Sequence, residues 1–249
     1  MPGTFSWVDL GTTDGAAAKV FYAGVFGWHF DDAEAGAEYT ICRLDGDAVC
    51  GLYEVSDEMR VADGPPAWMS YVTVENAASV AARTKQLGGE VVEDAFDVMD
   101  AGRTAVLRDP QGAFFSVWQP NTLIGADRVN DVGCLCMNEL VTTDVAASAA
   151  FYEALFGWNI DLSAAAPDVP SMVFNRGNIN AAVFAAPERL PSHWRACFTV
   201  ESTEKALERV QELGGRKLLD PVEIGHGSIA MARDPQGALF SIFAGETHP

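Results

Sequence analysis

The stretch FYAGVFGW at residues 21–28 returns as FYEALFGW at residues 151–158. Two longer pairs follow in the same order: WMSYVTVENAASVAARTKQLGG (68–89) with WRACFTVESTEKALERVQELGG (194–215), and RDPQGAFFSVW (108–118) with RDPQGALFSIF (233–243). The spacing between copies shrinks slightly along the chain, as expected if one domain was duplicated and its loops were later shortened. Three motif pairs in one order predict a tandem duplication. We expect domains at 5–120 and 134–244, joined by a linker at 121–133.

Each octet has the pattern of a helix end. Within each octet, the Phe, the Tyr and the apolar residues after them are separated by one, three or four positions. These spacings indicate a core-facing helix stripe. Asp14 and Asp144 are suited to cap the first turn, and Gly27 and Gly157 to end the helix in a left-handed conformation. The sequence therefore predicts helices at about 14–26, 76–87, 144–156 and 202–213.

Short alternating runs between these helices predict strands, among them YTICRL, AVCGLY, TAVLR and FFSVW. The Asp-Pro-Gln-Gly segments at 109–112 and 234–237 have turn residues at the positions of a tight turn between strands. Each half then has the order strand, helix, strands, twice over. The predicted class is α+β with four such modules.

Composition excludes several classes of function. The 249-residue chain has 16 basic and 35 acidic residues and a formal charge of −19, which argues against binding nucleic acid or an anionic membrane surface. No apolar run approaches a membrane span, and the N-terminus lacks a signal-peptide pattern, so we expect a cytoplasmic protein. Five cysteines without metal-type spacing, including Cys134 and Cys136 on one strand face, predict reduced, buried thiols.

The module order, the openings WVDLGTTD and NELVTTD, and the doubled RDPQGA hairpins resemble the vicinal oxygen chelate superfamily of glyoxalase I, bleomycin-resistance proteins and extradiol dioxygenases. The motifs WVDL, DAGR, IGA, HW and DPQGA are similar to two-domain actinobacterial members of glyoxalase type. The resemblance covers nearly the whole chain. It implies paired βαβββ modules, each half a curled mixed sheet forming a cup with helices outside, around a small-molecule site.

The resemblance also implies where a divalent metal ion would be bound. The six aligned ligand positions carry Trp7, Met69, Ser116, Met137, Arg195 and Ser241. None of these side chains is a good ligand for a hard or borderline cation. Glu54 is the one carboxylate near the remaining ligand position, and the histidines (His29, His193, His226 and His248) are expected in loops or the tail. We therefore predict no metal and no cofactor.

Strand alternation predicts which side chains face each cup. Asp9 shares a face with Trp7, Tyr71 shares a face with Met69, and Arg103 is expected toward the same cavity. The second cup would show Glu139 and Cys197 with Met137 and Arg195. We name Asp9 and Glu139 as candidate general bases, and as ligand-binding residues Trp7, Met69, Tyr71, Arg103, Ser116, Trp118, Met137, Arg195 and Ser241. An ion pair that only holds strands together is the structural alternative.

Two function classes stay open at this point. One is a metal-independent protein, a monomer or homodimer, that binds a small, partly apolar metabolite or drug for sequestration, resistance or an accessory role. The other is an enzyme, either a glyoxalase-type lyase or isomerase that depends on a metal, or a metal-free catalyst with Asp9 or Glu139 as general base. None of the six aligned positions carries a good metal ligand. This favours the metal-independent binding protein, because glyoxalase and dioxygenase chemistry rests on Lewis-acid activation.

Overall fold

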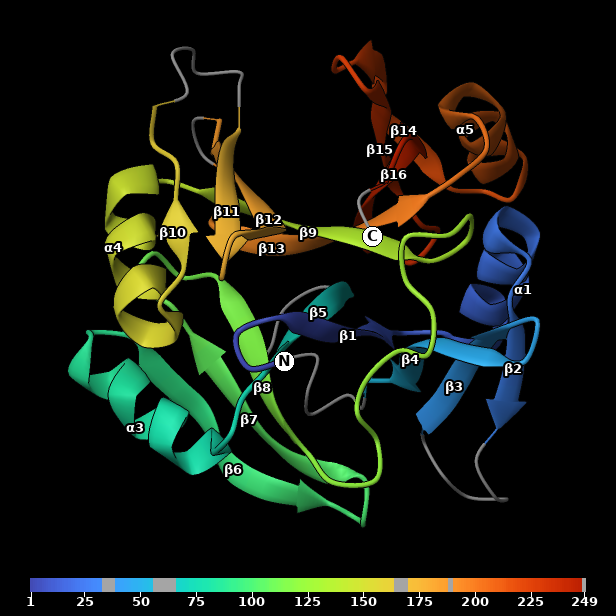
Figure 1. Cartoon of the computed structure of the whole chain (residues 1–249). Helices are drawn as coiled ribbons and strands as arrows, with labels where there is room; N and C mark the ends of the chain where they lie inside the picture. The colour runs from blue at the N-terminus through green and yellow to red at the C-terminus, as the bar shows by residue number, and fades with distance from the viewer. Residues whose placement is uncertain (33–38, 56–65, 164–169, 188–189, 248–249) are drawn as a thin grey trace. The chain divides into compact units, whose positions relative to one another are not determined.

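The computed structural model describes residues 1–32, 39–55, 66–163, 170–187 and 190–247. In this part of the chain the order strand, helix, three strands occurs four times (Figure 1). We call these runs modules 1 to 4. The prediction of four βαβββ modules is confirmed.

Modules 1 and 2 form the first repeat. Their elements are β1 (Phe5–Thr12), α1 (Gly15–Phe26), β2 (His29–Asp32), β3 (Tyr39–Leu44), β4 (Asp47–Glu54), β5 (Ala67–Thr73), α3 (Ala77–Gln86), β6 (Glu90–Val98), β7 (Gly102–Arg108) and β8 (Phe114–Pro120). Modules 3 and 4 form the second repeat. Their elements are β9 (Leu135–Thr142), α4 (Val145–Phe156), β10 (Asn159–Ile160), β11 (Ser171–Asn175), β12 (Asn178–Ala185), β13 (His193–Thr199), α5 (Thr203–Glu212), β14 (Arg216–Glu223), β15 (Gly227–Arg233) and β16 (Leu239–Gly245).

Within the described ranges, the strands form two mixed sheets of eight strands each. One has the order β2-β3-β4-β1-β5-β8-β7-β6, and the other has the equivalent order β10-β11-β12-β9-β13-β16-β15-β14. Within each module the first strand runs parallel to the last, as in the pairing of Asp9 with Gly51, while the hairpin strands are antiparallel. The predicted α+β class is confirmed.

Local chemistry accounts for the helix ends. The Oδ1 atom of Asp14 accepts a hydrogen bond from the Ala17 amide, and Asp144 caps α4 in the same way, each over 2.9 Å. Gly27 ends α1 at a φ of 77°, a left-handed conformation that glycine adopts without steric cost. All four predicted helices are confirmed to within one residue at each end.

The Asp-Pro-Gln-Gly segments form the predicted turns. The Oδ1 atom of Asp109 accepts hydrogen bonds from the amides of Gln111 and Ala113 over 2.9 and 2.8 Å, between β7 and β8. Asp234 does the same for Gly237 and Ala238 over 2.7 and 2.8 Å. Each aspartate therefore satisfies two backbone donors in a tight turn, and this is why Asp stands at its first position.

The chain folds into two compact units that cut across the two repeats. Unit 1 is Met1–Ser6, Met69–Gly125 and Met137–Arg195, and unit 2 is Trp7–Trp68, Ala126–Cys136 and Ala196–Pro249. Each unit has its own apolar core: modules 2 and 3 supply that of unit 1, and modules 1 and 4 that of unit 2. The repeat limits of 5–120 and 134–244 stay a prediction.

The octet stripe lies in these cores, as predicted. Phe21, Tyr22 and Phe26 of α1 are buried in unit 2, and Phe151 and Tyr152 of α4 are buried in unit 1. Their rings pack on one another and on neighbouring aromatic residues, with Tyr22 stacked on Phe26 at a centroid distance of 6.0 Å. The repeated octet is therefore a packing motif.

Candidate functional site

In unit 2, the predicted residues Trp7 and Asp9 of β1 share one sheet face and are directly hydrogen-bonded. The Oδ1 atom of Asp9 accepts from Trp7 Nε1 and from the Tyr39 hydroxyl, each over 2.5 Å. Asp9 is 4% exposed. The prediction that Trp7 and Asp9 share a face is confirmed, and Asp9 is held in place by two donors.

Gly51 explains how Tyr39 reaches Asp9. Gly51 pairs with Asp9 in the ladder between β4 and β1, and a Cβ atom there would collide with both the Tyr39 hydroxyl and the Asp9 carboxylate. Only glycine leaves room for this cluster. Glu54, the other carboxylate considered, accepts a hydrogen bond over 3.0 Å from the Gly15 amide at the start of α1.

In unit 1, module 2 presents one face that we call the hydroxyl face, made of Tyr71, Thr104, Ser116 and Trp118. Ladder pairing places them together, because Ser116 pairs with Tyr71 of β5 and Thr104 of β7 pairs with Trp118. The opposite face, with Val117 and other core residues, packs against α3. The predicted residues Tyr71, Ser116 and Trp118 are therefore brought together.

Two hydroxyl groups of this face lack hydrogen-bond partners in the part of the chain that the structure describes. Ser116 Oγ and Thr104 Oγ1 are buried, and neither has a partner among the residues that the structure describes. The residues themselves are 0% and 4% exposed. Leaving a buried hydroxyl unpaired costs about 1–3 kcal/mol, so each such group calls for an explanation.

Trp118 is fixed beside these hydroxyls. Its Nε1 atom donates to the Leu123 carbonyl over 2.8 Å. Its ring lies so close to Gly102 that a Cβ atom there would come within 2.5 Å of the ring carbon Cζ2. The ring therefore has a defined position that depends on glycine at residue 102.

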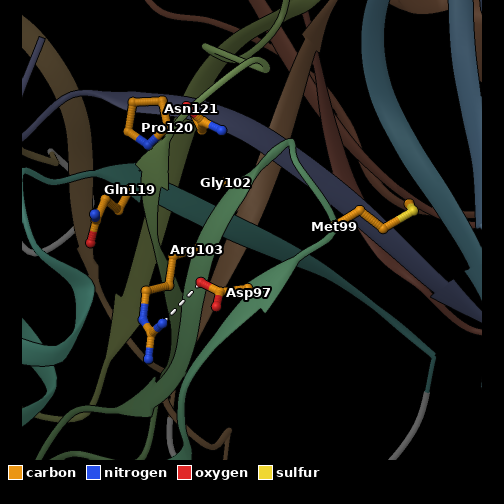
Figure 2. A pocket seen from close by; sticks show the side chains of 7 residues that line it. All are labelled: Asp97, Met99, Gly102, Arg103, Gln119, Pro120 and Asn121. Carbon is orange, nitrogen blue, oxygen red and sulfur yellow. Dashed lines mark hydrogen bonds and ion pairs between the residues drawn. The ribbon is translucent and has the colours of Figure 1, made fainter.

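Arg103 does not lie on the hydroxyl face, so the prediction that places it beside Tyr71 is wrong. It shares its face with Ala105 and Leu107, as predicted, but these two residues belong to the core on the α3 side of the sheet. Figure 2 shows Arg103 directed toward Asp97, with Nη1 and Oδ1 2.9 Å apart. A second guanidinium nitrogen donates to the Ala95 carbonyl over 2.7 Å.

Arg103 lines a surface pocket of about 430 Å³ at the ends of β6, β7 and β8 (Figure 2). The lining residues are Asp97, Met99, Gly102, Arg103, Gln119, Pro120 and Asn121. The Asp97 carboxylate lies against the guanidinium, and the side chains of Arg103 and Asp97 are 37% and 70% exposed. Such a pair contributes little to stability, and it already satisfies the cation.

In unit 1, Glu139 of β9 and Arg195 of β13 form a buried ion pair, the structural alternative that the sequence left open. The Oε2 atom of Glu139 accepts from Arg195 Nε over 2.7 Å and from Nη2 over 2.6 Å. The two side chains are 2% and 10% exposed. Both guanidinium donors bind the same carboxylate oxygen, so the pair occupies Glu139 and makes it a weak candidate for a general base.

His193 was missed at the sequence level. The sequence analysis expected it in a loop, but it is the first residue of β13, two positions before Arg195. Strand alternation places His193 and Arg195 on one face, and this signal was available in the sequence. We call the set Glu139, Arg195 and His193 the ion-pair face.

The remaining predicted residues lie on strands as expected. Met69 and Met137 are half-buried on β5 and β9. Ser241 is fully buried on β16, where it pairs with Cys197 of β13. No disulfide links the five cysteines, which all lie in the described ranges, and burial raises the pKa of the Cys134 thiol to about 11. His248 lies outside the described residues.

The residues present do not fit the divalent metal that the resemblance implies. The six aligned positions carry indole, thioether, hydroxyl and guanidinium groups, as the sequence shows. Within the described ranges, no three His, Cys, Asp or Glu side chains gather in a way that could hold a metal ion.

The described helices are also too short or too polar to cross a membrane.

Comparisons with known proteins agree with this architecture. Residues 4–117 match the family described as the Glyoxalase/Bleomycin resistance protein/Dioxygenase superfamily, and residues 134–243 match a glyoxalase-like domain. "Putative glyoxylase CFP32" of Mycobacterium bovis is 36% identical over 247 residues, covering 96% of this chain and 94% of the relative. "Anthracycline biosynthesis protein DnrV" of Streptomyces peucetius is 32% identical over 257 residues, covering 97% and 93%.

Solved structures share the fold at low sequence identity. The Mn(II)-bound glyoxalase from Novosphingobium aromaticivorans has a TM-score of 0.68 at 15% identity, covering 98% of this chain and 82% of that one. The 2,3-dioxygenase LapB from Pseudomonas sp. KL28 has a TM-score of 0.67 at 16% identity, covering 100% and 95%. At this level of identity the likeness concerns the fold alone.

Proposed function

The chain belongs to the Glyoxalase/Bleomycin resistance protein/Dioxygenase superfamily, and from this premise we propose that it binds a small, partly apolar metabolite or drug on the hydroxyl face of unit 1, without a metal ion. One observation carries the proposal: Ser116 Oγ and Thr104 Oγ1 are buried without partners in the described part of the chain. A ligand with hydroxyl or carbonyl groups would satisfy both. The role would be sequestration, resistance or an accessory step.

The neighbours of these hydroxyls favour a ligand with a ring. Trp118 offers a fixed aromatic surface on the same face, and Tyr71 lies beside Ser116 in the ladder. Apolar walls with a few convergent polar groups are the usual form of a small-molecule site. Two relatives are named for anthracycline biosynthesis, so an anthracycline is a reasonable first probe.

The donor set supports metal independence. Serine and threonine hydroxyls bind divalent cations weakly, and the thioether of Met69 suits soft copper rather than zinc, nickel or iron. A buried divalent ion needs three or four good donors. We therefore expect ligand binding to survive removal of metal.

The binding test is a fluorescence titration of an anthracycline against protein dialysed with EDTA. Ser116→Ala and Thr104→Val should each weaken binding about tenfold, since each removes one hydrogen bond to the ligand. Ser79→Ala on the exposed side of α3 is the matched control and should leave binding unchanged. If the two variants bind as the wild type does, the hydroxyl face is not the site.

A stability measurement separates binding from a structural role. In the unliganded protein, Ser116→Ala removes an unpaired buried hydroxyl, so its free energy of unfolding should stay equal or rise. A residue that only supported the fold would lose stability on the same change. Higher stability with weaker binding is the expected pair of results.

The enzyme reading is favoured by one observation, the relative named as a glyoxylase. Its test is hemithioacetal isomerisation by the dialysed protein, before and after adding nickel, zinc or ferrous iron. Stoichiometric metal uptake with activity would overturn metal independence and support the lyase or isomerase. Metal-free activity lost in Asp9→Asn or Glu139→Gln would instead support one of these carboxylates as general base.

A further inference from the structure

Among the described residues, one ring nitrogen of His193 has a hydrogen-bond partner and the other has none. Nδ1 lies 2.9 Å from the Pro191 carbonyl oxygen, and since a carbonyl only accepts, Nδ1 carries the proton and donates. Nε2 is buried and has no hydrogen-bond partner within the part of the chain that the structure describes. A buried acceptor in this state marks a place where a donor is missing.

The imidazole is held in its neutral form. Burial is the main cause that lowers the pKa of His193 below 6.5, and the Arg195 charge adds to it. At neutral pH, Nε2 therefore presents a lone pair. Such a nitrogen can accept a hydrogen bond from a ligand or take up its proton.

The surroundings of His193 have the character of a small-molecule site. Arg195 is fixed on the same face by its two hydrogen bonds to Glu139. Ladder pairing adds an apolar wall, because Glu139 pairs with Ala182 of β12 and Ala182 pairs with Met172 of β11. A few polar groups beside apolar side chains suit a small, mostly apolar compound.

The local charge selects the kind of donor. Arg195 lies two positions from His193 on the same strand face and lowers its pKa, while Glu139 acts in the opposite direction. A cationic donor such as an ammonium group is therefore disfavoured, and a neutral hydroxyl is favoured. An acidic hydroxyl gains most, because Arg195 attracts the negative charge on its oxygen.

We propose that the ion-pair face of unit 1 is a second small-molecule site, which takes a phenol or enol with an apolar body whose O–H donates to Nε2 of His193. Glu139 acts as a positioning residue that holds Arg195. The proposal is independent of the hydroxyl face, and the two can fail separately.

The test uses phenol, with anisole as the matched compound that lacks the hydroxyl donor. Each is titrated into the ¹⁵N-labelled full chain, and the imidazole nitrogens of the four histidines are followed by NMR. The His193 signals are identified as those missing in His193→Asn. Phenol should move the Nε2 signal upfield, as a nitrogen that accepts a hydrogen bond does, and anisole should not.

Two variants make the test specific. Asn at 193 keeps a donor for the Pro191 carbonyl but lacks the Nε2 acceptor, so phenol affinity should fall about tenfold. Gln at 193 places an amide oxygen near the Nε2 position, so His193→Gln should recover part of that affinity. Ser79→Ala, on the exposed side of α3, is the matched control and should leave phenol binding at His193 unchanged.

The results of these titrations either support or overturn the site at His193. A phenol-specific shift of Nε2, a loss in His193→Asn and a recovery in His193→Gln support the site. No shift, an equal shift with anisole, or unchanged phenol affinity in His193→Asn overturns it. Loss of anthracycline binding in Ser116→Ala with intact phenol binding would show that the two faces are separate sites.

Discussion

Tyr22 of α1 donates a hydrogen bond to Oδ2 of Asp234 over 3.0 Å, although 212 residues separate them in the chain. Tyr152 of α4 makes the equivalent bond to Asp109, also over 3.0 Å. Each octet therefore places its tyrosine on the Asp-Pro-Gln-Gly turn of the other repeat. This reciprocal pairing within each unit is a physical reason for the sequence to contain both motifs twice.

The first prediction concerns Tyr22→Phe. The change keeps the ring but leaves the buried Asp234 oxygen without its donor and the Trp68 indole without its acceptor. We expect a loss of about 1–3 kcal/mol in the free energy of unfolding, measured by urea denaturation. Val20→Ala, at a 70% exposed position of the same helix, is the control and should stay within about 0.5 kcal/mol. Equal stability of wild type and Tyr22→Phe would contradict the role of this bond.

The second prediction concerns the pH dependence contributed by Asp234. Burial is the main cause that raises its pKa above 3.8. A carboxyl group with a raised pKa in the folded state contributes stability that is full below 3.8 and is lost as the pH rises through the folded pKa. The side chain in Asp234→Asn does not ionise. The excess in free energy of unfolding of the wild type over this variant should therefore shrink as the pH rises.

Urea denaturation at several pH values from about 3 to 7 measures this difference. Asp109→Asn is the companion variant in unit 1, because burial raises the pKa of Asp109 as well. If the excess in free energy of unfolding of the wild type instead grew with pH, the prediction would be contradicted.

The third prediction concerns His193, whose shift has the opposite sense. Burial lowers its pKa below 6.5, so its contribution is full above 6.5 and is lost as the pH falls through the folded pKa. The wild type should lose stability on acidification below 6.5 more steeply than His193→Asn, which has no group that titrates there. Parallel curves for the two proteins in thermal denaturation would rule this out.

The fourth prediction concerns the buried pair of Glu139 and Arg195. Arg195→Met leaves the Glu139 carboxylate buried without its partner and should cost about 3–5 kcal/mol of stability. Adding Glu139→Gln should recover a large part of this loss, because the buried charge is then removed as well. Purely additive effects in this double-mutant cycle, measured by urea denaturation, would show that the pair is not coupled.

Local signals determined much of this fold from the sequence. Asp14 and Asp144 cap helices, Gly27 and Gly157 end them, and the Asp-Pro-Gln-Gly segments turn between strands, because each of these depends on contacts within about four residues. Strand alternation likewise brought Trp7 to Asp9. The repeat placed all of these features in both halves.

Alternation alone did not decide which face of a strand meets the core. It correctly grouped Arg103 with Ala105 and Leu107, but that face packs against α3, so Arg103 is separated from Tyr71 and pairs with Asp97. His193 was missed for a different reason: the sequence analysis placed it in a loop, whereas it is the first residue of β13. Which side of a sheet a helix covers depends on packing, and no local pattern contains it.

The tertiary structure decided how the repeats are combined. The sequence by itself determined four modules in order, each a strand, a helix and further strands, since hydrophobic period, caps and turns are local properties. Only the folded chain joins modules 1 and 4 in one core and modules 2 and 3 in the other, pairs Tyr22 with Asp234, and leaves Ser116 Oγ and His193 Nε2 buried without partners among the described residues. These features depend on side chains that are far apart in sequence and bury one another from water. The stabilising free energy of this burial is gained only when the segments pack together in the folded chain.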